Sequence, residues 1–376
     1  MSKLVIIGGS KGLGFAILKQ IHNQFESVSL LDLNEPIESF DNVSYIKIDL
    51  SKDNYSSFES LVSSADTLII TAGIGQVKPF SEINEIEINK IFRTNTKSVL
   101  LFINYFYKKL LSNSDAKCLI ISSIAGEVSS PLFSVYGASK ASISKFCESI
   151  NTELEKENSI NRVTCVIATA FTGTSFDGGE TDVNKLKDIA NECIVAMNNK
   201  ETKHFVNKEK CLEIIDSYYK NNAEFSRTSY DYKMKNNRIS HEKKYVIGYL
   251  SGTFDLFHIG HLNILKKAKE QCDYLIVGVH ESGSWKGKET FIPFEERLEI
   301  VQSIKFVDKA VKSFKEDSDA WEEYHFDKLF VGSDYKGSER FERYEKFFKD
   351  KGVKIIYFPY TKGTNSTQLR DKILKK

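Results

Sequence analysis

The chain has 376 residues, which is long for a single ordinary domain and predicts two. Hydrophobic residues make up 41% and charged residues 27%, the balance of a globular protein. The net charge of +1 argues against a bulk electrostatic field that would attract nucleic acid or an anionic membrane. No apolar run approaches the length needed to span a bilayer, so membrane insertion is not expected.

The six cysteines are scattered along the chain, with no Cys-x-x-Cys pair. This pattern predicts reduced thiols, and neither a disulfide framework nor a zinc site. The chain begins directly with a predicted strand and shows no signal peptide, so we expect a cytoplasmic protein.

The first apolar run, residues 4–7, predicts a buried strand. A glycine-rich loop follows, with glycines at Gly8, Gly12 and Gly14, and then an apolar pattern typical of a helix. A strand, a glycine loop and a helix in this order form a cradle for the pyrophosphate of a dinucleotide.

The second predicted strand, residues 28–31, ends at Asp32, eighteen residues after Gly14. A carboxylate at this point can accept hydrogen bonds from both ribose hydroxyls of NAD. Lys11 in the glycine loop favours the other cofactor, because a basic residue there can pair with the 2′-phosphate of NADP. Both NAD(H) and NADP(H) stay open, with NAD(H) preferred.

A catalytic constellation follows the predicted strand 119–121. Tyr136 stands thirteen residues after Ser123, and Lys140 four residues after Tyr136. Residues four apart share a helix face, so the phenol and the ammonium can point into one site. We expect the ammonium to lower the tyrosine pKa, which would suit proton transfer near neutral pH.

These motifs together resemble the short-chain dehydrogenase/reductase family over residues 1–225. The resemblance implies that Ser123 holds the substrate carbonyl or hydroxyl, that Tyr136 moves the proton, and that Asn95 supports a water relay. Thr71 stands where the family usually has asparagine. The residues implied to contact the cofactor are Gly8, Lys11, Gly12, Gly14, Asp32, Asp49, Leu50, Ala72 and Gly73.

The family's usual final strand is not visible in the sequence. Residues 226–244 carry six basic residues and little apolar periodicity, and we interpret them as a linker. This places the expected domain boundary at residue 240, with domains at 1–240 and 241–376.

The second half opens with a predicted strand at residues 245–250. It is followed by the stretch Gly252-Thr253-Phe254-Asp255-Leu256-Phe257-His258-Ile259-Gly260-His261 and then a predicted helix. Two histidines therefore stand where a strand leads into the amino end of a helix. Backbone N–H groups and the helix dipole attract anions there, and both imidazoles can donate to phosphate oxygens.

This stretch resembles the HxGH signature of the nucleotidylyltransferase superfamily. It is most similar to cytidylyltransferases that activate phospho-alcohols, and the resemblance covers residues 243–376. Either Lys286 or Lys288 would be the family's phosphate-binding lysine, while Arg297 matches a motif arginine or is an exposed helix charge. The residues implied to contact the nucleotide and its phosphates are Gly252, Thr253, Phe254, His258, His261, Lys286, Lys288, Arg297, Ser366 and Thr367.

Strands and helices alternate through both halves, with further strands predicted at 274–279, 328–332 and 353–358. The alternation predicts an α/β fold with two doubly wound parallel-sheet (Rossmann-like) domains in tandem. Each site would lie at the carboxyl edge of its sheet.

The two resemblances imply a bifunctional enzyme. It would reduce a ketose phosphate, with ribulose 5-phosphate favoured, and couple the resulting polyol phosphate to CMP from CTP. The products would be pyrophosphate and a CDP-polyol of the CDP-ribitol or CDP-glycerol type, for synthesis of a surface polymer. We expect Mg²⁺ with the triphosphate, no metal ligands from the protein, no nucleic-acid partner, and a homo-oligomer (dimer or tetramer).

Two alternatives stay open. The second domain could be an adenylyltransferase that makes an ADP-sugar, because the paired histidines do not by themselves read the base. The first domain could instead sense the nicotinamide cofactor and regulate the second. The presence of Asn95, Ser123, Tyr136 and Lys140 argues against a sensor.

Overall fold

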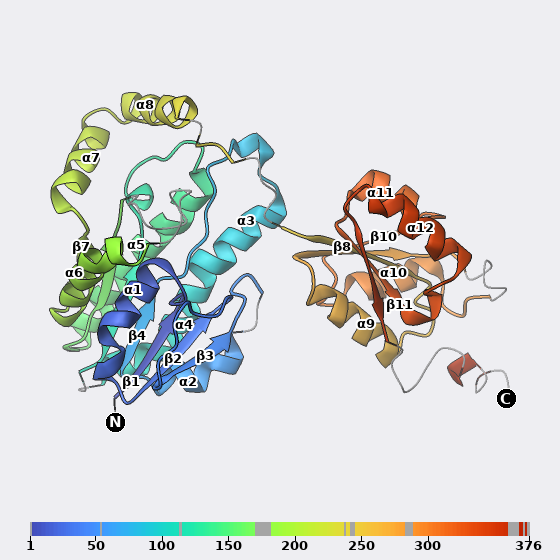
Figure 1. Ribbon diagram of the computed structural model, residues 1–376, viewed down its shortest axis with the longest axis horizontal. Coiled ribbons are helices and arrows are strands. Elements are labelled where there is room, and N and C mark those ends of the chain that lie inside the picture. The colour runs from blue at the N-terminus through green and yellow to red at the C-terminus, as the bar shows by residue number, and fades with distance from the viewer. Residues whose placement is uncertain are drawn as a thin grey trace. The chain divides into compact units, whose positions relative to one another are not determined.

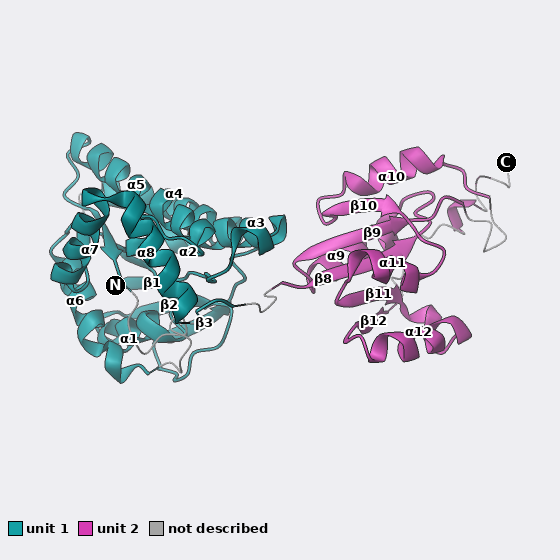
Figure 2. Ribbon diagram, turned by 90° about the horizontal axis from the view of Figure 1, so that it is seen from above, with its two compact units in different colours: residues 1–242 teal, residues 243–376 magenta. Residues whose placement is uncertain are grey.

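The chain divides into two compact units, Met1–Glu242 and Lys243–Lys376, in the computed structural model (Figure 2). The structure describes residues 2–52, 55–112, 115–169, 182–236, 238–240, 245–282, 289–359, 368–370 and 373. The division falls two residues beyond the boundary expected at residue 240.

The described part of unit 1 contains a seven-stranded parallel sheet in the order β3-β2-β1-β4-β5-β6-β7 (Figure 1). The order reverses between β1 and β4, and ligands bind beside such a reversal in open α/β sheets. The strands are β1 (Lys3–Ile7), β2 (Ser27–Asp32), β3 (Val43–Lys47), β4 (Thr67–Ile70), β5 (Lys117–Ile121), β6 (Val163–Ile167) and β7 (Lys203–Phe205).

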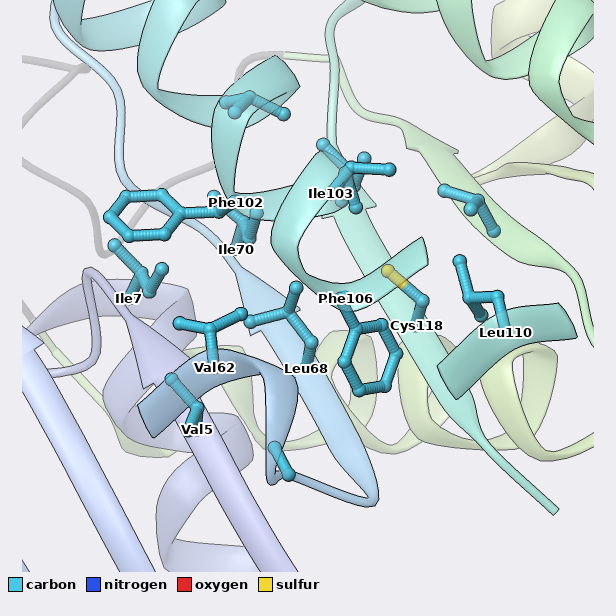
Figure 3. Packing of buried hydrophobic residues seen from close by; sticks show 14 of the residues in the cluster. Val5, Ile7, Val62, Leu68, Ile70, Phe102, Ile103, Phe106, Leu110 and Cys118 are labelled. Atoms are coloured by element: carbon cyan, nitrogen blue, oxygen red, sulfur yellow. The ribbon is translucent and has the colours of Figure 1, made fainter. Parts of the chain in front are cut away.

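Helices cover both faces of this sheet, which explains why its strands are continuous apolar runs. Leu4 and Ile6 of β1 face one cluster, packed by helices α1 and α6, whereas Val5 and Ile7 face another, packed by helix α4 (Figure 3). The helices are α1 (Gly12–Ile21), α2 (Glu59–Ser63), α3 (Glu85–Phe92), α4 (Ser98–Leu111), α5 (Ser134–Lys156), α6 (Lys187–Asn198), α7 (Lys208–Lys220) and α8 (Asn222–Lys235).

The final strand of unit 1, which is not visible in the sequence, is present as β7; it pairs with β6 over only three residues and is too short to show a pattern. One expectation for the end of unit 1 was wrong. The expected linker at 226–244 is helical as far as Lys235. Helix α8 begins where the Asn221 side chain accepts a hydrogen bond from the Glu224 N–H at 3.1 Å. None of its residues is fully buried, so it lacks the apolar periodicity on which the expectation relied.

The described part of unit 2 contains a five-stranded parallel sheet in the order β10-β9-β8-β11-β12, which reverses between β8 and β11. The predicted fold class, two doubly wound parallel sheets in tandem, is confirmed. Its elements are β8 (Ile247–Gly252), α9 (Ile259–Lys269), β9 (Tyr274–Val279), α10 (Phe294–Gln302), β10 (Lys309–Lys312), α11 (Asp317–Tyr324), β11 (Lys328–Gly332), α12 (Glu339–Lys349) and β12 (Lys354–Phe358).

All six cysteines are buried and none forms a disulfide, as the sequence predicts. Among the described residues, no helix is both long and apolar enough to cross a bilayer.

The core of unit 1 can be tested separately from unit 2. Phe102 is fully buried between α4 and the sheet, so Phe102→Ala should lower the free energy of unfolding of unit 1 by about 3–5 kcal/mol. Both tryptophans, Trp285 and Trp321, belong to unit 2. In urea titrations the midpoint of the circular dichroism transition should therefore move to a lower urea concentration, while the midpoint of the tryptophan fluorescence transition stays unchanged.

Asn104→Ala, on the exposed face of the same helix, is the matched control and should move neither transition. A fluorescence transition that shifts with Phe102→Ala would contradict independent folding of the two units.

Candidate active sites of the two units

The glycine loop of unit 1 lies where the first strand meets the first helix. Gly8 has a φ of +91°, and a Cβ there would come within 2.4 Å of the Ala72 backbone nitrogen. A Cβ at Gly14 would lie 2.3 Å from the Gly8 carbonyl oxygen. Thr71 donates its hydroxyl to that same oxygen at 2.7 Å, so it stabilises the loop in place of the family's asparagine.

The carboxylates expected to contact the cofactor end two neighbouring strands. Asp32, at the end of β2, accepts the Ser10 N–H at 3.0 Å, which ties it to the glycine loop. Asp49 follows β3 and accepts both the N–H and the hydroxyl of Ser51. Leu50 is buried.

These residues fit a dinucleotide. The amino end of α1, where Lys11 stands as the N-cap residue, can receive an anionic group, and nothing lies within 4 Å of the place that a Cβ would take on Gly12. Asp32 lies at the adjacent strand end, where a ribose would reach it.

The catalytic residues expected after β5 come together. The Ser123 hydroxyl hydrogen-bonds the Tyr136 phenol. Lys140 lies with its Nζ 5.8 Å from the centroid of the Tyr136 ring and donates to the Ile121 carbonyl at 2.8 Å. Gly73 is close by, since a Cβ there would be 3.3 Å from the Lys140 Nζ.

Asn95 joins this cluster through a local break in the helix. It lies in a π-helical turn, Arg93–Lys97, between α3 and α4, a kind of turn often found at functional sites. Its amide donates to the Ile74 carbonyl and accepts the Ile74 N–H, each at 2.8 Å, and it also donates to the Ser139 hydroxyl. Asn95 therefore holds the loop after β4 against the helix that carries Tyr136.

The expected lowering of the tyrosine pKa by the ammonium is wrong for this structure. Burial raises the pKa of Tyr136 to about 12, opposed by the hydrogen bond from Ser123. The Lys140 ammonium is directed at the Ile121 carbonyl, and burial lowers its own pKa to about 8. Tyr136 is therefore protonated at neutral pH, as the proton donor in a carbonyl reduction must be.

The rim of this site contains residues that sequence reasoning missed. Phe133 stacks on Tyr136 with 4.1 Å between ring centroids, and a Cβ at Gly75 would touch both rings. Lys78 donates its N–H to the Leu132 carbonyl at 2.6 Å, which joins the loops after β4 and β5. None of these residues belongs to a recognisable motif.

In unit 2 the two histidines stand at the amino end of α9 with their rings stacked 3.9 Å apart. The Nδ1 of His258 accepts the Gly260 N–H at 3.0 Å, and the Nδ1 of His261 accepts the His258 N–H at 3.4 Å. A neutral imidazole that accepts at Nδ1 carries its proton on Nε2. Burial lowers the pKa of His258, so it is neutral at pH 7 and has an Nε2–H that can donate to phosphate.

The loop before the histidines is strained and tightly held. Phe254 and Leu256 have φ values of +53° and +48°, which non-glycine residues rarely adopt. Between them Asp255 accepts the N–H groups of Phe291 and Ile292 at 3.1 Å and pairs with Arg370 at 3.2 Å. Sequence reasoning missed both Asp255 and Arg370 as anchors, although Asp255 lies inside the quoted motif.

Arg297 is fully buried, so the interpretation as an exposed helix charge is wrong. Its guanidinium donates to the carbonyls of Ile292, Thr253, His280 and Glu281 at 2.5–2.9 Å. These bonds use four of its five N–H groups and join two loops at the carboxyl edge of the sheet, the one after β8 and the one after β9.

Of the other residues expected to contact the nucleotide, Gly252 ends β8 and packs against the Phe254 ring. Lys286, Lys288, Ser366 and Thr367 lie outside the described residues.

Comparisons with known proteins agree with the division of the chain into two units. Residues 2–182 match the sequence model of the short chain dehydrogenase family, and residues 249–372 match that of the cytidylyltransferase-like family. The chain is 34% identical to glycerol-3-phosphate cytidylyltransferase of Staphylococcus aureus over 137 residues, which are 35% of this chain and 97% of that protein. This chain is a short-chain dehydrogenase fused to a cytidylyltransferase.

The reductase unit also has named relatives. It is 33% identical to an (S)-acetoin-forming diacetyl reductase of Staphylococcus epidermidis, over 41% of this chain and 66% of that protein. A short chain dehydrogenase from Burkholderia cenocepacia, solved with NADP, has the same fold, with a TM-score of 0.51 at 18% identity over 61% of this chain and 97% of that one. The fused chain is thus an enzyme with an oxidoreductase unit that binds NAD(P) and a cytidylyltransferase unit.

The position of Asp32 predicts a preference for NADH, because its carboxylate would bond free ribose hydroxyls and repel a 2′-phosphate. Asp32→Ala should lower the ratio of kcat/KM with NADH to kcat/KM with NADPH by about 10- to 100-fold, the loss of one hydrogen bond to a charged group. Asp41→Ala, an exposed carboxylate, is the control. A wild type that already prefers NADPH would show that Lys11 outweighs Asp32.

The histidine geometry predicts separable effects of two substitutions. Asparagine is a good N-cap, so His258→Asn should keep the start of α9 while removing the Nε2–H donor, whereas His258→Ala removes both. Cytidylyl transfer should fall by about 100- to 1,000-fold in both variants, with a lower melting temperature only for His258→Ala.

The exposed His325 provides the control, because His325→Asn should leave transfer unchanged and asparagine tolerates its positive φ. Near wild-type transfer by His258→Asn would show that the imidazole only caps the helix.

Proposed function

We propose that the chain makes a CDP-polyol in two steps, reduction of a ketose phosphate followed by cytidylyl transfer to the resulting polyol phosphate. Ribulose 5-phosphate is the favoured ketose, and dihydroxyacetone phosphate is the second candidate. The observation that carries the proposal is that one chain contains both a Ser123, Tyr136 and Lys140 cluster and the paired histidines.

In the first step, NAD(P)H supplies the hydride that adds to the carbonyl carbon. Ser123 and Tyr136 bond the carbonyl oxygen, and the Tyr136 proton passes to that oxygen as the hydride arrives. Lys140 and Asn95 support this transfer, Lys140 through its buried ammonium and Asn95 by holding the loop after β4. The diacetyl reductase acts on a small ketone that carries a second oxygen on the adjacent carbon, as does a ketose.

In the second step, a phosphate oxygen of the polyol phosphate attacks the α-phosphorus of CTP. A new P–O bond forms, the bond to the β-phosphate breaks, and pyrophosphate leaves. No protein nucleophile is needed, so catalysis consists of positioning and stabilisation of charge on the phosphoryl oxygens. The Nε2–H groups of His258 and His261 would donate to those oxygens, and Mg²⁺ would accompany the triphosphate.

The relatives of unit 2 support a polyol phosphate as the acceptor. Three glycerol-3-phosphate cytidylyltransferases, from Staphylococcus aureus and two Bacillus species, are 32–34% identical to this chain. Glycerol 3-phosphate is itself the reduction product of a ketose phosphate, dihydroxyacetone phosphate. A product of this kind would serve as a precursor of a surface polymer.

The decisive experiment is a one-pot reaction of ketose phosphate, NADH and CTP, analysed by mass spectrometry. The wild type should form the CDP-polyol. Tyr136→Phe should form none, because it lacks the phenolic proton donor, yet should form CDP-polyol when polyol phosphate is supplied directly. His258→Asn should oxidise NADH without forming the nucleotide product.

Several results would overturn the proposal. A cytidylylated product that keeps its ketone, or a failure of every phosphorylated ketose to drive NADH oxidation, would mean that the two sites serve separate substrates. Product formation with ATP and not CTP would favour an adenylyltransferase. Loss of transfer by Tyr136→Phe on supplied polyol phosphate would favour regulation of unit 2 by unit 1.

A further inference from the structure

The end of unit 1 forms an extension, residues 208–240, that lies beyond the part matching the family model, residues 2–182. It contains α7 and α8, and it lies on the side of the sheet where the strands end (Figure 1). That side is where ligands bind in a doubly wound sheet. The contacts of the extension can therefore affect the reductase site.

The extension touches the two loops that form the rim of this site. The Lys233 ammonium in α8 donates to the Ser130 hydroxyl at 2.9 Å and to the Pro131 carbonyl at 2.7 Å, both in the loop after β5. Ser240 donates its N–H to the Val77 carbonyl at 2.9 Å, and Gln76 donates to the Ser240 hydroxyl at 2.7 Å, in the loop after β4.

The two residues that Lys233 contacts, Ser130 and Pro131, lie close to the catalytic tyrosine in the chain. Pro131 is two residues from Phe133, a span of at most about 7 Å, and Phe133 stacks on the Tyr136 ring. Ser130 packs against the next residue of the same helix, since a Cβ at Gly137 would lie 3.8 Å from the Ser130 Cβ. The Lys233 ammonium is therefore bonded to the segment that leads directly into the helix carrying Tyr136, at the rim of the reductase site.

The charge of Lys233 distinguishes it from Lys78, another cation at the rim of the reductase site. Lys78 is paired with Glu87, with its Nζ 3.0 and 3.2 Å from the two carboxylate oxygens, so its charge is neutralised. Among the residues that the structure describes, Lys233 has no carboxylate partner. An ammonium has three N–H donors, and the neutral oxygens of Ser130 and Pro131 use two of them.

A partly buried cation with neutral partners is costly unless an anion joins it. Burial, with a smaller contribution from the Arg238 guanidinium, lowers the pKa of Lys233 to about 8. A phosphate dianion beside Lys233 would raise its pKa again, because the negative charge stabilises the charged ammonium.

We propose that Lys233 binds the phosphate group of the reductase substrate, so that the extension selects phosphorylated ketoses over free ones. This assignment rests on the proposed function, and it names the residue that reads the phosphate. Lys233 contributes the remaining N–H and its charge, and the contact of Ser240 with the loop after β4 holds the extension in place.

The test compares ribulose 5-phosphate with free ribulose as substrates for NADH oxidation. Lys233→Met keeps the aliphatic stem and removes the charge, and it should reduce the preference for the phosphorylated sugar by about 10- to 100-fold, through KM rather than kcat. Lys233→Arg should restore part of the preference. Lys235→Met, an exposed lysine two positions along the same helix, is the matched control and should keep the wild-type preference.

A purely structural role for Lys233 gives a different result. If the lysine only anchors α8, Lys233→Met should slow the reduction of both sugars equally and leave the preference for the phosphorylated sugar unchanged. That outcome would overturn the proposal. Inorganic phosphate adds a second measurement. It should inhibit the wild type and Lys235→Met competitively with the sugar, and much less so Lys233→Met.

A labelling experiment separates failure of this proposal from failure of the proposed function. The wild type is treated with trinitrobenzenesulfonate, with and without inorganic phosphate, and modification of Lys233 and Lys235 is followed by peptide mass mapping. Phosphate should protect Lys233 and not Lys235, even if no ketose phosphate is reduced. Equal modification of Lys233 with and without phosphate would refute the phosphate site, whatever the reductase substrate proves to be.

Discussion

Both active sites depend on one constraint, the burial of each parallel sheet by helices on both faces. Side chains on the faces pack into apolar cores, as Leu4 and Val5 do on opposite sides of β1. Polar groups that must meet a ligand can then lie only at the carboxyl edge, where the strands end and backbone groups are left without sheet partners. The loops after β1 and β8 both lie next to the point where the strand order reverses.

Buried polar side chains hold these loops in place. Asn95 bonds both the N–H and the carbonyl of Ile74, and Arg297 bonds four carbonyls from two loops. Each buried backbone group left without a partner would cost about 1–3 kcal/mol, so these anchors allow irregular loops to be rigid. Arg297 stabilises the loop after β8 by donating to the Thr253 carbonyl of that loop. This is a positioning function, and a motif match cannot distinguish it from direct contact with phosphate.

The extension of unit 1 shows where sequence patterns fail. Helix α8 buries no residue completely, so its helical character depends on capping by Asn221 and on contacts made by single polar side chains such as Lys233. Hydrophobic periodicity reports only on helices that bury a face. Strand β7 escaped notice for a related reason, since three residues are too few to define a pattern.

The sequence by itself determined the two families, the fold class and the order of the motifs. The apolar strand runs, the glycine loop and the paired histidines are local patterns, because their spacing follows from the geometry of a strand leading into a helix. Only the tertiary structure decided which side chains face one another. It directed the Lys140 ammonium to the Ile121 carbonyl rather than to the phenol, buried Arg297 among carbonyls, and brought Lys233 to Ser130, about a hundred residues away in sequence. Such contacts depend on the packing of distant elements and on which charges that packing leaves without a partner, and a one-dimensional pattern records neither.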